Sequence, residues 1–227
     1  MKLGERLAAV ASMVPAGCRL ADIGTDHAYL PLQLAANGHI ERAVAIDVNP
    51  GPYKSACDAV RRERQTGRID VRIGNGLQPL NPGEIDVAVM AGMGAMTMIA
   101  ILEARPDITA SLARLILQPM TAAPQLRRWL QANGWMIVDE TIVRDEGRLY
   151  EIIAAVPGVM AAGDLLEVGP LLWQRRHPLL GELLRQRLET HYLIRNEMAK
   201  SAAARENPKY QEQEAIIAIL EERLSCL

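Results

Sequence analysis

Five short apolar segments alternate with segments of helical periodicity along the chain, and this alternation restricts the fold more than any other feature. The apolar segments, which we predict to be strands, are residues 19–23, 43–47, 69–73, 85–90 and 114–117. Strands that alternate with helices are joined by crossover connections, so their sheet is parallel and lies between layers of helices. A chain of 227 residues is long enough for one such domain and a small additional one.

Two further predicted strands, residues 135–143 and 149–156, break this pattern. The five residues between them are too few for a crossover helix, so the two strands should form an antiparallel hairpin at the sheet edge. A dinucleotide-binding Rossmann domain would continue with parallel crossovers, whereas class I methyltransferases end their sheet in such a hairpin. The predicted fold class is therefore α/β, with a Rossmann-like, seven-stranded sheet similar to that of class I methyltransferases.

The composition changes again near residue 157. Residues 179–204 are charged and helical in periodicity, Asn207-Pro208 interrupts the pattern, and residues 209–224 predict a second helix. The short connection predicts an antiparallel helical hairpin. We therefore expect a first domain at residues 1–157 and a small, coiled-coil-like helical domain at residues 158–227.

The first predicted strand ends in a turn that is rich in polar side chains. Gly24 allows the backbone to turn sharply without a side chain that would obstruct a ligand. Five polar residues lie around it, namely Asp22, Thr25, Asp26, His27 and Tyr29. Because parallel α/β sheets bind ligands at the carboxyl ends of their strands, this turn predicts the floor of an active site.

Asp47 ends the second predicted strand, where a carboxylate can bind the ribose of an adenosine-containing cofactor or can simply cap the strand end. The preceding turn has one glycine, Gly24, whereas a pyrophosphate-binding loop has three. Asp22 and Asp26 would repel a pyrophosphate but suit a cationic ligand, such as the sulfonium of S-adenosylmethionine. The sequence thus favours a methyl donor over a dinucleotide, with a structural, buried role for Asp22 as the alternative.

Three later strand ends carry further candidates. Residues 74–76, Gly-Asn-Gly, form either an ordinary turn or a contact to the cofactor adenine. Residues 91–95, Ala-Gly-Met-Gly-Ala, allow a flat base near the backbone with Met93 as an apolar contact, or are a plain glycine-rich turn. Gln118 and Pro119 end the fifth predicted strand, where the Gln118 amide could reach a base.

Two residues of the first turn have several possible roles. His27 could hold the carboxylate of the donor, contact the substrate or be structural. Tyr29 could stack on a base or pack beneath the following helix. The three cysteines and the other histidines lack metal-ligand spacing, so we predict neither a metal site nor a disulfide framework.

The formal net charge of −2 gives no general attraction to nucleic acid, so an RNA site would need a local basic patch. The densest basic clusters are Arg61 to Arg68, Arg127-Arg128 and Arg175-Arg176. Each of them could equally be a solvated helix face. No apolar segment is long enough for a signal peptide or a membrane span, and we therefore expect a cytoplasmic protein.

Taken together, the chain resembles the bacterial tRNA (adenine-22-N1)-methyltransferases. The motifs that carry this resemblance are Asp22-Ile23-Gly24-Thr25-Asp26-His27-Ala28-Tyr29-Leu30-Pro31, Ala91-Gly92-Met93-Gly94 and Ile116-Leu117-Gln118-Pro119. The segment Tyr150-Glu151-Ile152-Ile153 and the helical C-terminal region also agree, so the resemblance spans nearly the whole chain. The chain departs from the family pattern at Asn75, Ala95 and Met120, where an acid, a glycine and an asparagine are expected.

The resemblance implies that S-adenosylmethionine donates a methyl group to N1 of adenosine 22 in tRNA, leaving S-adenosylhomocysteine. The implied cofactor-binding residues are Asp22, Gly24, Thr25, Asp26, His27, Asp47, Val48, Asn75, Gly76, Leu77, Ala91 and Gly92. The implied catalytic residues are His27, Tyr29, Met93, Gln118 and Pro119. The implied partner is tRNA, without a membrane or a metal, and both a monomer and a weak dimer stay open.

Three other functions remain compatible with the sequence. An NAD(P)-dependent oxidoreductase shares the outline of the fold but would need the glycine-rich loop. A methyltransferase could act on a small molecule or a protein instead of tRNA. A non-catalytic RNA-binding protein could also retain the cofactor pocket.

Overall fold

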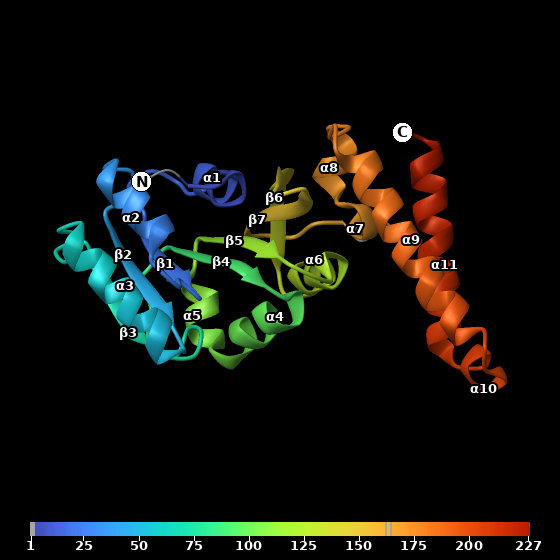
Figure 1. Ribbon diagram of the computed structural model, residues 1–227, viewed down its shortest axis with the longest axis horizontal. Coiled ribbons are helices and arrows are strands. Elements are labelled where there is room, and N and C mark those ends of the chain that lie inside the picture. Colours follow the sequence, from blue (N-terminus) through green and yellow to red (C-terminus); the bar gives the residue numbers. More distant parts are fainter. Residues whose placement is uncertain (1–2, 162, 164) are drawn as a thin grey trace. The chain divides into compact units, whose positions relative to one another are not determined.

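The computed structural model describes residues 3–161, 163 and 165–227. The chain divides into two compact units, Met1–Ala161 and Ala162–Leu227, named unit 1 and unit 2 below. Unit 1 contains a sheet with helices around it, and unit 2 is helical (Figure 1).

Unit 1 is built on one sheet of seven strands, in the order β3-β2-β1-β4-β5-β7-β6. The first five strands are parallel, and β7 pairs antiparallel with both β5 and β6. The strands are β1 (Arg19–Ile23), β2 (Arg42–Asp47), β3 (Ile69–Ile73), β4 (Val87–Met93), β5 (Arg114–Pro119), β6 (Trp135–Asp145) and β7 (Arg148–Pro157). The predicted seven-stranded α/β sheet with a terminal hairpin is confirmed.

Helices cover both faces of this sheet (Figure 1). They are α1 (Glu5–Ser12), α2 (Tyr29–Ala36), α3 (Pro50–Arg62), α4 (Ala95–Ala104), α5 (Pro106–Ser111) and α6 (Ala123–Ala132). The central strands are almost continuously apolar and buried, as expected for a parallel sheet that is covered on both faces. Asp22 is a buried carboxylate in this apolar centre, which directs attention to the end of β1.

Two strands are longer than the sequence predicts, and the difference reshapes the site. The expected turn after residue 90 is instead the end of β4, which continues to Met93 through a register shift between Ala91 and Met93. Gly92 has a φ of +83° at this irregularity, a conformation that glycine adopts without strain. β5 likewise extends through Gln118 to Pro119, so the motif residues of both strands belong to the sheet.

The hairpin turn is shorter than predicted. β6 and β7 extend toward each other until Glu146 and Gly147 alone connect them, and both residues have positive φ values of +47° and +77°. Two such residues match the twist of antiparallel strands. As a result, Asp145, predicted to lie in a loop, is the last residue of a strand.

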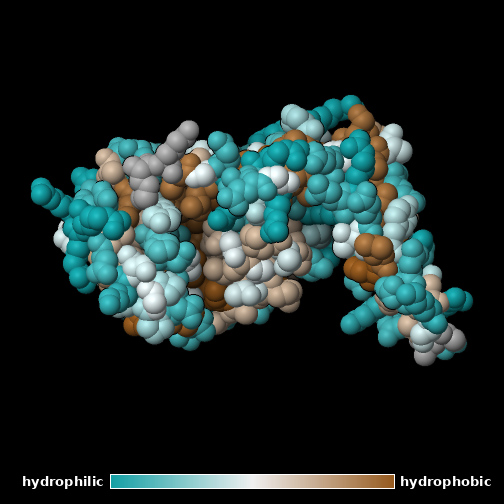
Figure 2. Space-filling model, in the orientation of Figure 1, coloured by the Kyte–Doolittle hydropathy of each residue, from teal (hydrophilic) through white to brown (hydrophobic). Residues whose placement is uncertain are grey.

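Unit 2 contains α7 (Leu165–Val168), α8 (Pro170–Gln174), α9 (Leu180–Met198), α10 (Ala202–Arg205) and α11 (Pro208–Ser225). The helices α9 and α11 pack side by side as the predicted antiparallel pair (Figure 1). The predicted helix at residues 179–204 is wrong at its end, because α9 stops at Met198 and α10 is separate. Asn207 caps α11 by accepting a hydrogen bond from the Lys209 N–H (2.9 Å). Hydrophilic residues cover most of the face of unit 2 seen in Figure 2.

Candidate functional site

A cavity of about 490 Å³ lies at the carboxyl ends of β1 and β4 in unit 1. Seven residues that the sequence predicts as site residues line it, namely Asp22, Gly24, Thr25, Asp26, Tyr29, Ala91 and Gly92. Five other lining residues were not predicted, namely Gly4, Arg6, Leu7, Leu30 and Asp145. The cavity therefore joins the first polar turn to the end of β4, the N-terminal helix and the β6–β7 hairpin.

The turn after β1 is held in an unusual backbone conformation. Gly24 has a φ of +75°, and a Cβ at this position would lie 3.1 Å from Cε of Met93. The N–H groups of Gly24 and Thr25 both donate to the carbonyl oxygen of Ile46 in β2, at 2.8 and 3.0 Å. The backbone angle therefore favours glycine at position 24, and any side chain here would also have to displace the end of Met93.

Asp22 is the buried acid of this turn. Its Oδ2 accepts a hydrogen bond from the Thr25 hydroxyl at 2.6 Å. Burial raises the pKa of the Asp22 carboxyl to about 6, the hydrogen bond from Thr25 opposes this rise, and the negative charge of Asp47 adds to it. Within the described part of the chain, no cation pairs with Asp22. A ligand that brings a positive charge would supply the missing partner.

Asp47 is also buried and ties two backbone segments together. Its Oδ2 accepts from the Asp26 N–H at 3.2 Å, and its Oδ1 accepts from the Asn49 N–H at 2.9 Å. This is the strand-end role that the sequence left open for Asp47. Each carboxylate oxygen has a second lone pair, so the predicted contact to a ribose stays a prediction.

The rings of His27 and Tyr29 lie next to each other, with their centroids 5.1 Å apart and an interplanar angle of 21°. Nε2 of His27 is 3.6 Å from Oδ1 of Asp26. Tyr29 lines the cavity, whereas His27 is not among the lining residues. The structure thus places Tyr29 at the site and His27 beside it.

Gln118 does not have the role that the sequence predicts. It is fully buried, its Oε1 accepts from the Gly92 N–H (3.1 Å) and from Nη1 of Arg6 (2.6 Å), and its Nε2 donates to the Pro119 carbonyl (3.1 Å). The amide is fully used inside the protein, so it cannot reach a base. Gln118 instead fixes Gly92 and Arg6 at the cavity.

The other predicted residues lie outside this cavity. Asn75 lines a separate hollow of about 400 Å³ with residues of α4. Gly76 has a φ of +58°, and its Cβ would lie 2.6 Å from Ile101, so a turn here requires glycine. Leu77 is buried, and Val48 is exposed directly after Asp47. The remaining two, Met93 and Pro119, pair with each other across β4 and β5.

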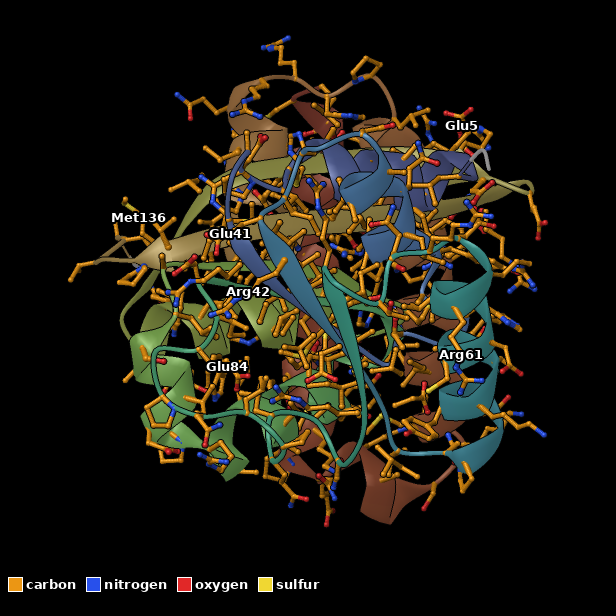
Figure 3. All side chains as sticks on the ribbon, turned by 90° about the vertical axis from the view of Figure 1, so that its left-hand side faces the viewer. Glu5, Glu41, Arg42, Arg61, Glu84 and Met136 are labelled. Carbon is orange, nitrogen blue, oxygen red and sulfur yellow. The ribbon has the colours of Figure 1, made fainter. Side chains whose placement is uncertain are left out.

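The residues of the first basic cluster, which the sequence left open as a solvated helix face or as phosphate contacts, differ from one another. Arg61 is exposed on α3 (Figure 3), 3.3 Å from Asp58. Arg68 donates to the carbonyl of Ala35 at 3.1 Å, so it is tied to α2.

Arg127 is neither a phosphate contact nor part of a solvated helix face, so both predicted roles are wrong for it. It is completely buried and pairs with Glu140 in β6 (2.7 Å) and Glu151 in β7 (2.6 Å). A guanidinium in this position joins α6 to the hairpin and cannot contact RNA.

Two residues of the cavity wall carried only weak signals in the sequence. Arg6 belongs to the short helix α1, which precedes the first strand, and Asp145 to a segment predicted as a connection. Arg6 and Asp145 meet because α1 packs on β6, and this tertiary contact cannot be predicted from local sequence patterns. The Arg6 guanidinium lies over the ring of Tyr150, 5.6 Å from its centroid.

The described residues contain neither a membrane-spanning helix nor a cluster of metal ligands. None of the helices in the described ranges has the length and apolarity needed to cross a membrane. Within the same ranges, no group of three or more His, Cys, Asp or Glu side chains is arranged to hold a metal ion.

The chain has clear relatives. A sequence profile of the tRNA (adenine(22)-N(1))-methyltransferase family matches residues 20–222. The tRNA (adenine(22)-N(1))-methyltransferase of Bacillus subtilis is 34% identical over 215 residues, which cover 91% of this chain and 90% of the relative.

Solved structures agree with this match. The crystal structure of the B. subtilis m1A22 tRNA methyltransferase aligns with a TM-score of 0.90 and 32% identity, over 98% of this chain and 99% of the other. The Streptococcus pneumoniae protein Sp1610, in complex with S-adenosyl-L-methionine, aligns with a TM-score of 0.87 and 33% identity, over 98% of this chain and 100% of the other.

Proposed function

The chain belongs to the tRNA (adenine(22)-N(1))-methyltransferase family, and we propose that it transfers a methyl group from S-adenosylmethionine to N1 of adenosine 22 in tRNA. The observation that carries this proposal is the cavity itself. It combines an acid-rich turn after β1, suited to a cationic donor, with an open backbone at Gly92, suited to a flat base.

The residues of the β1 turn fit the donor. S-adenosylmethionine supplies an electrophilic methyl group on a positively charged sulfur, together with an amino group that is also cationic. Asp22 is a buried carboxylate without a cationic partner among the described residues, and Asp26 lies on the same cavity. Gly24 removes the side chain that would block a close approach. We assign the amino acid part of the donor to this turn.

The adenosine part of the donor belongs, in this proposal, to the following strand ends. The residues we assign to it are Asp47, Val48, Asn75, Gly76 and Leu77. Asp47 lies beside the turn through its bond to the Asp26 N–H. Asn75 presents an amide from the end of β3, which supports a contact to a base.

The acceptor needs positioning more than activation. The N1 lone pair of adenine is unprotonated at neutral pH, so a strong general base is unnecessary and orientation supplies most of the acceleration. We place the base beside Tyr29 and Gly92, which line the cavity, with Met93 next to Gly24 as a neighbouring apolar side chain. N1 lies on the base-pairing edge, and the nucleotide must therefore leave the folded tRNA before it reaches this site.

We assign the rest of the tRNA contact to both units. Unit 2 exposes polar side chains on helices α9 and α11, and we assign these helices to contacts with the shape and phosphates of the tRNA. Because tRNA is the substrate, we propose that the protein works in the cytoplasm.

The test uses the purified protein, labelled S-adenosylmethionine and two transcripts of one bacterial tRNA, with adenosine or guanosine at position 22. N1-methyladenosine, detected by mass analysis after nucleoside digestion, should form in the first transcript and not in the second. Methylation of both would place the acceptor elsewhere. Donor binding without any methylated nucleoside would favour a different substrate or a non-catalytic protein.

A further inference from the structure

We propose that the carboxylate of Asp145 accepts a hydrogen bond from the exocyclic amine of the target adenine, so that Asp145 selects adenine and stabilises the transition state. This inference rests on the proposed function. It assigns a role to a residue that the sequence patterns did not single out.

Asp145 lines the same cavity as Asp22 and Gly92 but comes from the end of β6. Its Oδ2 accepts a hydrogen bond from the backbone N–H of Arg6 at 3.3 Å. Among residues 3–161, its Oδ1 has no hydrogen-bond partner. A half-buried carboxylate with one anchored oxygen therefore presents a free acceptor at a ligand cavity.

The hydrogen bond from the Arg6 N–H holds the Asp145 carboxylate in place. α1 begins after Gly4, which has no side chain to cap the first N–H groups of the helix. Asp145 replaces the missing cap by bonding the N–H of Arg6, and its Oδ2 lies 3.3 Å from where a Cβ of Gly4 would be. The Arg6 side chain is fixed in turn by Gln118 and Tyr150.

The remaining acids of the cavity are less suited to the acceptor. Asp22 is buried and already bound by Thr25, and Asp26 belongs to the turn that we assign to the donor. Asp145 lies on a different element and is bonded to the backbone of Arg6, whose guanidinium shares the Gln118 Oε1 acceptor with the Gly92 N–H. The acid on the acceptor side is therefore Asp145.

The chemistry of adenine requires an acceptor there. In the reaction, the N1 lone pair forms a bond to the methyl carbon while the carbon–sulfur bond breaks and the sulfur keeps its electron pair. The positive charge moves from sulfur to the ring, where N1 shares it with the neighbouring amine at C6. A hydrogen bond from this amine to a carboxylate becomes stronger as the charge develops, which lowers the barrier.

The same contact distinguishes adenine from guanine. Adenine presents a donor, its amine, next to N1, whereas guanine presents a carbonyl oxygen at the corresponding position. A carboxylate facing that oxygen would be repelled, and the Asp145 site would be left without its hydrogen bond.

Asp145→Asn tests the inference because the amide oxygen can still cap α1 while the free position loses its charge and presents a donor. The methylation rate at saturating substrates should fall about 10- to 100-fold. Donor affinity, measured by calorimetry, and the midpoint of thermal unfolding should stay at wild-type values. Glu146→Gln is the matched control, because Glu146 is the exposed neighbour outside the cavity and should keep the full rate.

A second substrate isolates the amine. A tRNA with purine riboside at position 22 keeps N1 but lacks the amine, so the wild type should prefer adenosine, and this preference should fall about 10- to 100-fold in Asp145→Asn. A readout without turnover is affinity for tRNA that already carries the cationic N1-methyladenosine. This affinity should fall in Asp145→Asn by more than the affinity for unmodified tRNA.

The outcomes separate the two proposals. A wild type that does not methylate the adenosine transcript contradicts the proposed function itself. A wild type that methylates it, together with an Asp145→Asn variant that keeps the rate and the base preference, overturns only the role of Asp145. A variant that loses stability and activity while keeping the base preference would also overturn it, because Asp145 would then act as a helix cap alone.

Discussion

At the scale of a single residue, burial of Asp22 favours the neutral carboxyl, whereas the proposed binding of a cationic donor favours the ionised carboxylate. Its pKa of about 6 in the folded protein exceeds the value of about 3.9 in an unfolded chain, so the folded state holds the proton more tightly. The contribution of Asp22 to the free energy of unfolding is therefore largest below pH 4, falls as the pH rises from 4 to 6, and stays low above. We expect a donor cation to reverse this cost by pairing with the ionised carboxylate.

Asp22→Asn should raise the free energy of unfolding at pH 8 by up to about 3 kcal/mol, and by clearly less at pH 5. The amide oxygen can still accept the Thr25 hydroxyl, so the turn should persist. Donor affinity should nevertheless fall. Denaturant unfolding at both pH values and calorimetry with S-adenosylmethionine check this, and an equal stability difference at pH 5 and pH 8 would contradict it.

The residue scale also limits what a sequence can predict. Asp22, Gly24 and Tyr29 reach the cavity as expected, because strand, glycine and helix fix their positions locally. Gln118 was predicted to reach a base because it ends the fifth strand at the same sheet edge, yet its amide oxygen accepts hydrogen bonds from Gly92 and Arg6. Such burial depends on distant residues, which local patterns do not contain.

At the scale of elements, Arg127 joins α6 to both strands of the hairpin through Glu140 and Glu151. Arg127→Met should lower the free energy of unfolding by about 3–5 kcal/mol, because it removes a buried guanidinium that pairs with two buried carboxylates. Gln125→Met, at an exposed position of α6, is the control and should change stability little. A small effect of Arg127→Met in denaturant unfolding would show that water or other groups satisfy the carboxylates.

The elements themselves were largely predictable. The period of the apolar residues and the short hairpin connection predicted the sheet, because both are local properties of the chain. The ends of β4 and β5 were not predictable, since glycine and proline are rare in strands. Gly92 and Pro119 lie in the sheet here because Ala91 pairs with Gln118 and Met93 pairs with Pro119. The short helices α5, α7 and α8 were also missed, because one or two turns leave little periodicity to detect.

For the whole molecule, we propose that the division into two units separates donor binding from part of tRNA binding. The cavity that we assign to the donor is lined by residues of unit 1. A formal net charge of −2 means that tRNA must be held by local cations, and unit 2 exposes Arg185 on α9 and Lys209 on α11. We expect these two side chains to contact phosphates.

The double variant Arg185→Gln, Lys209→Gln should bind tRNA more weakly. The negative slope of log affinity against log salt concentration should become less steep by about 1 to 2, because fewer phosphate contacts mean that fewer counterions are released on binding. Its donor affinity should be unchanged. The matched control is Arg61→Gln, Arg62→Gln, since these exposed cations on α3 each lie beside an acid, at 3.3 and 3.6 Å. If the control pair changes the salt slope instead, tRNA lies over α3, and unit 2 does not supply the phosphate contacts.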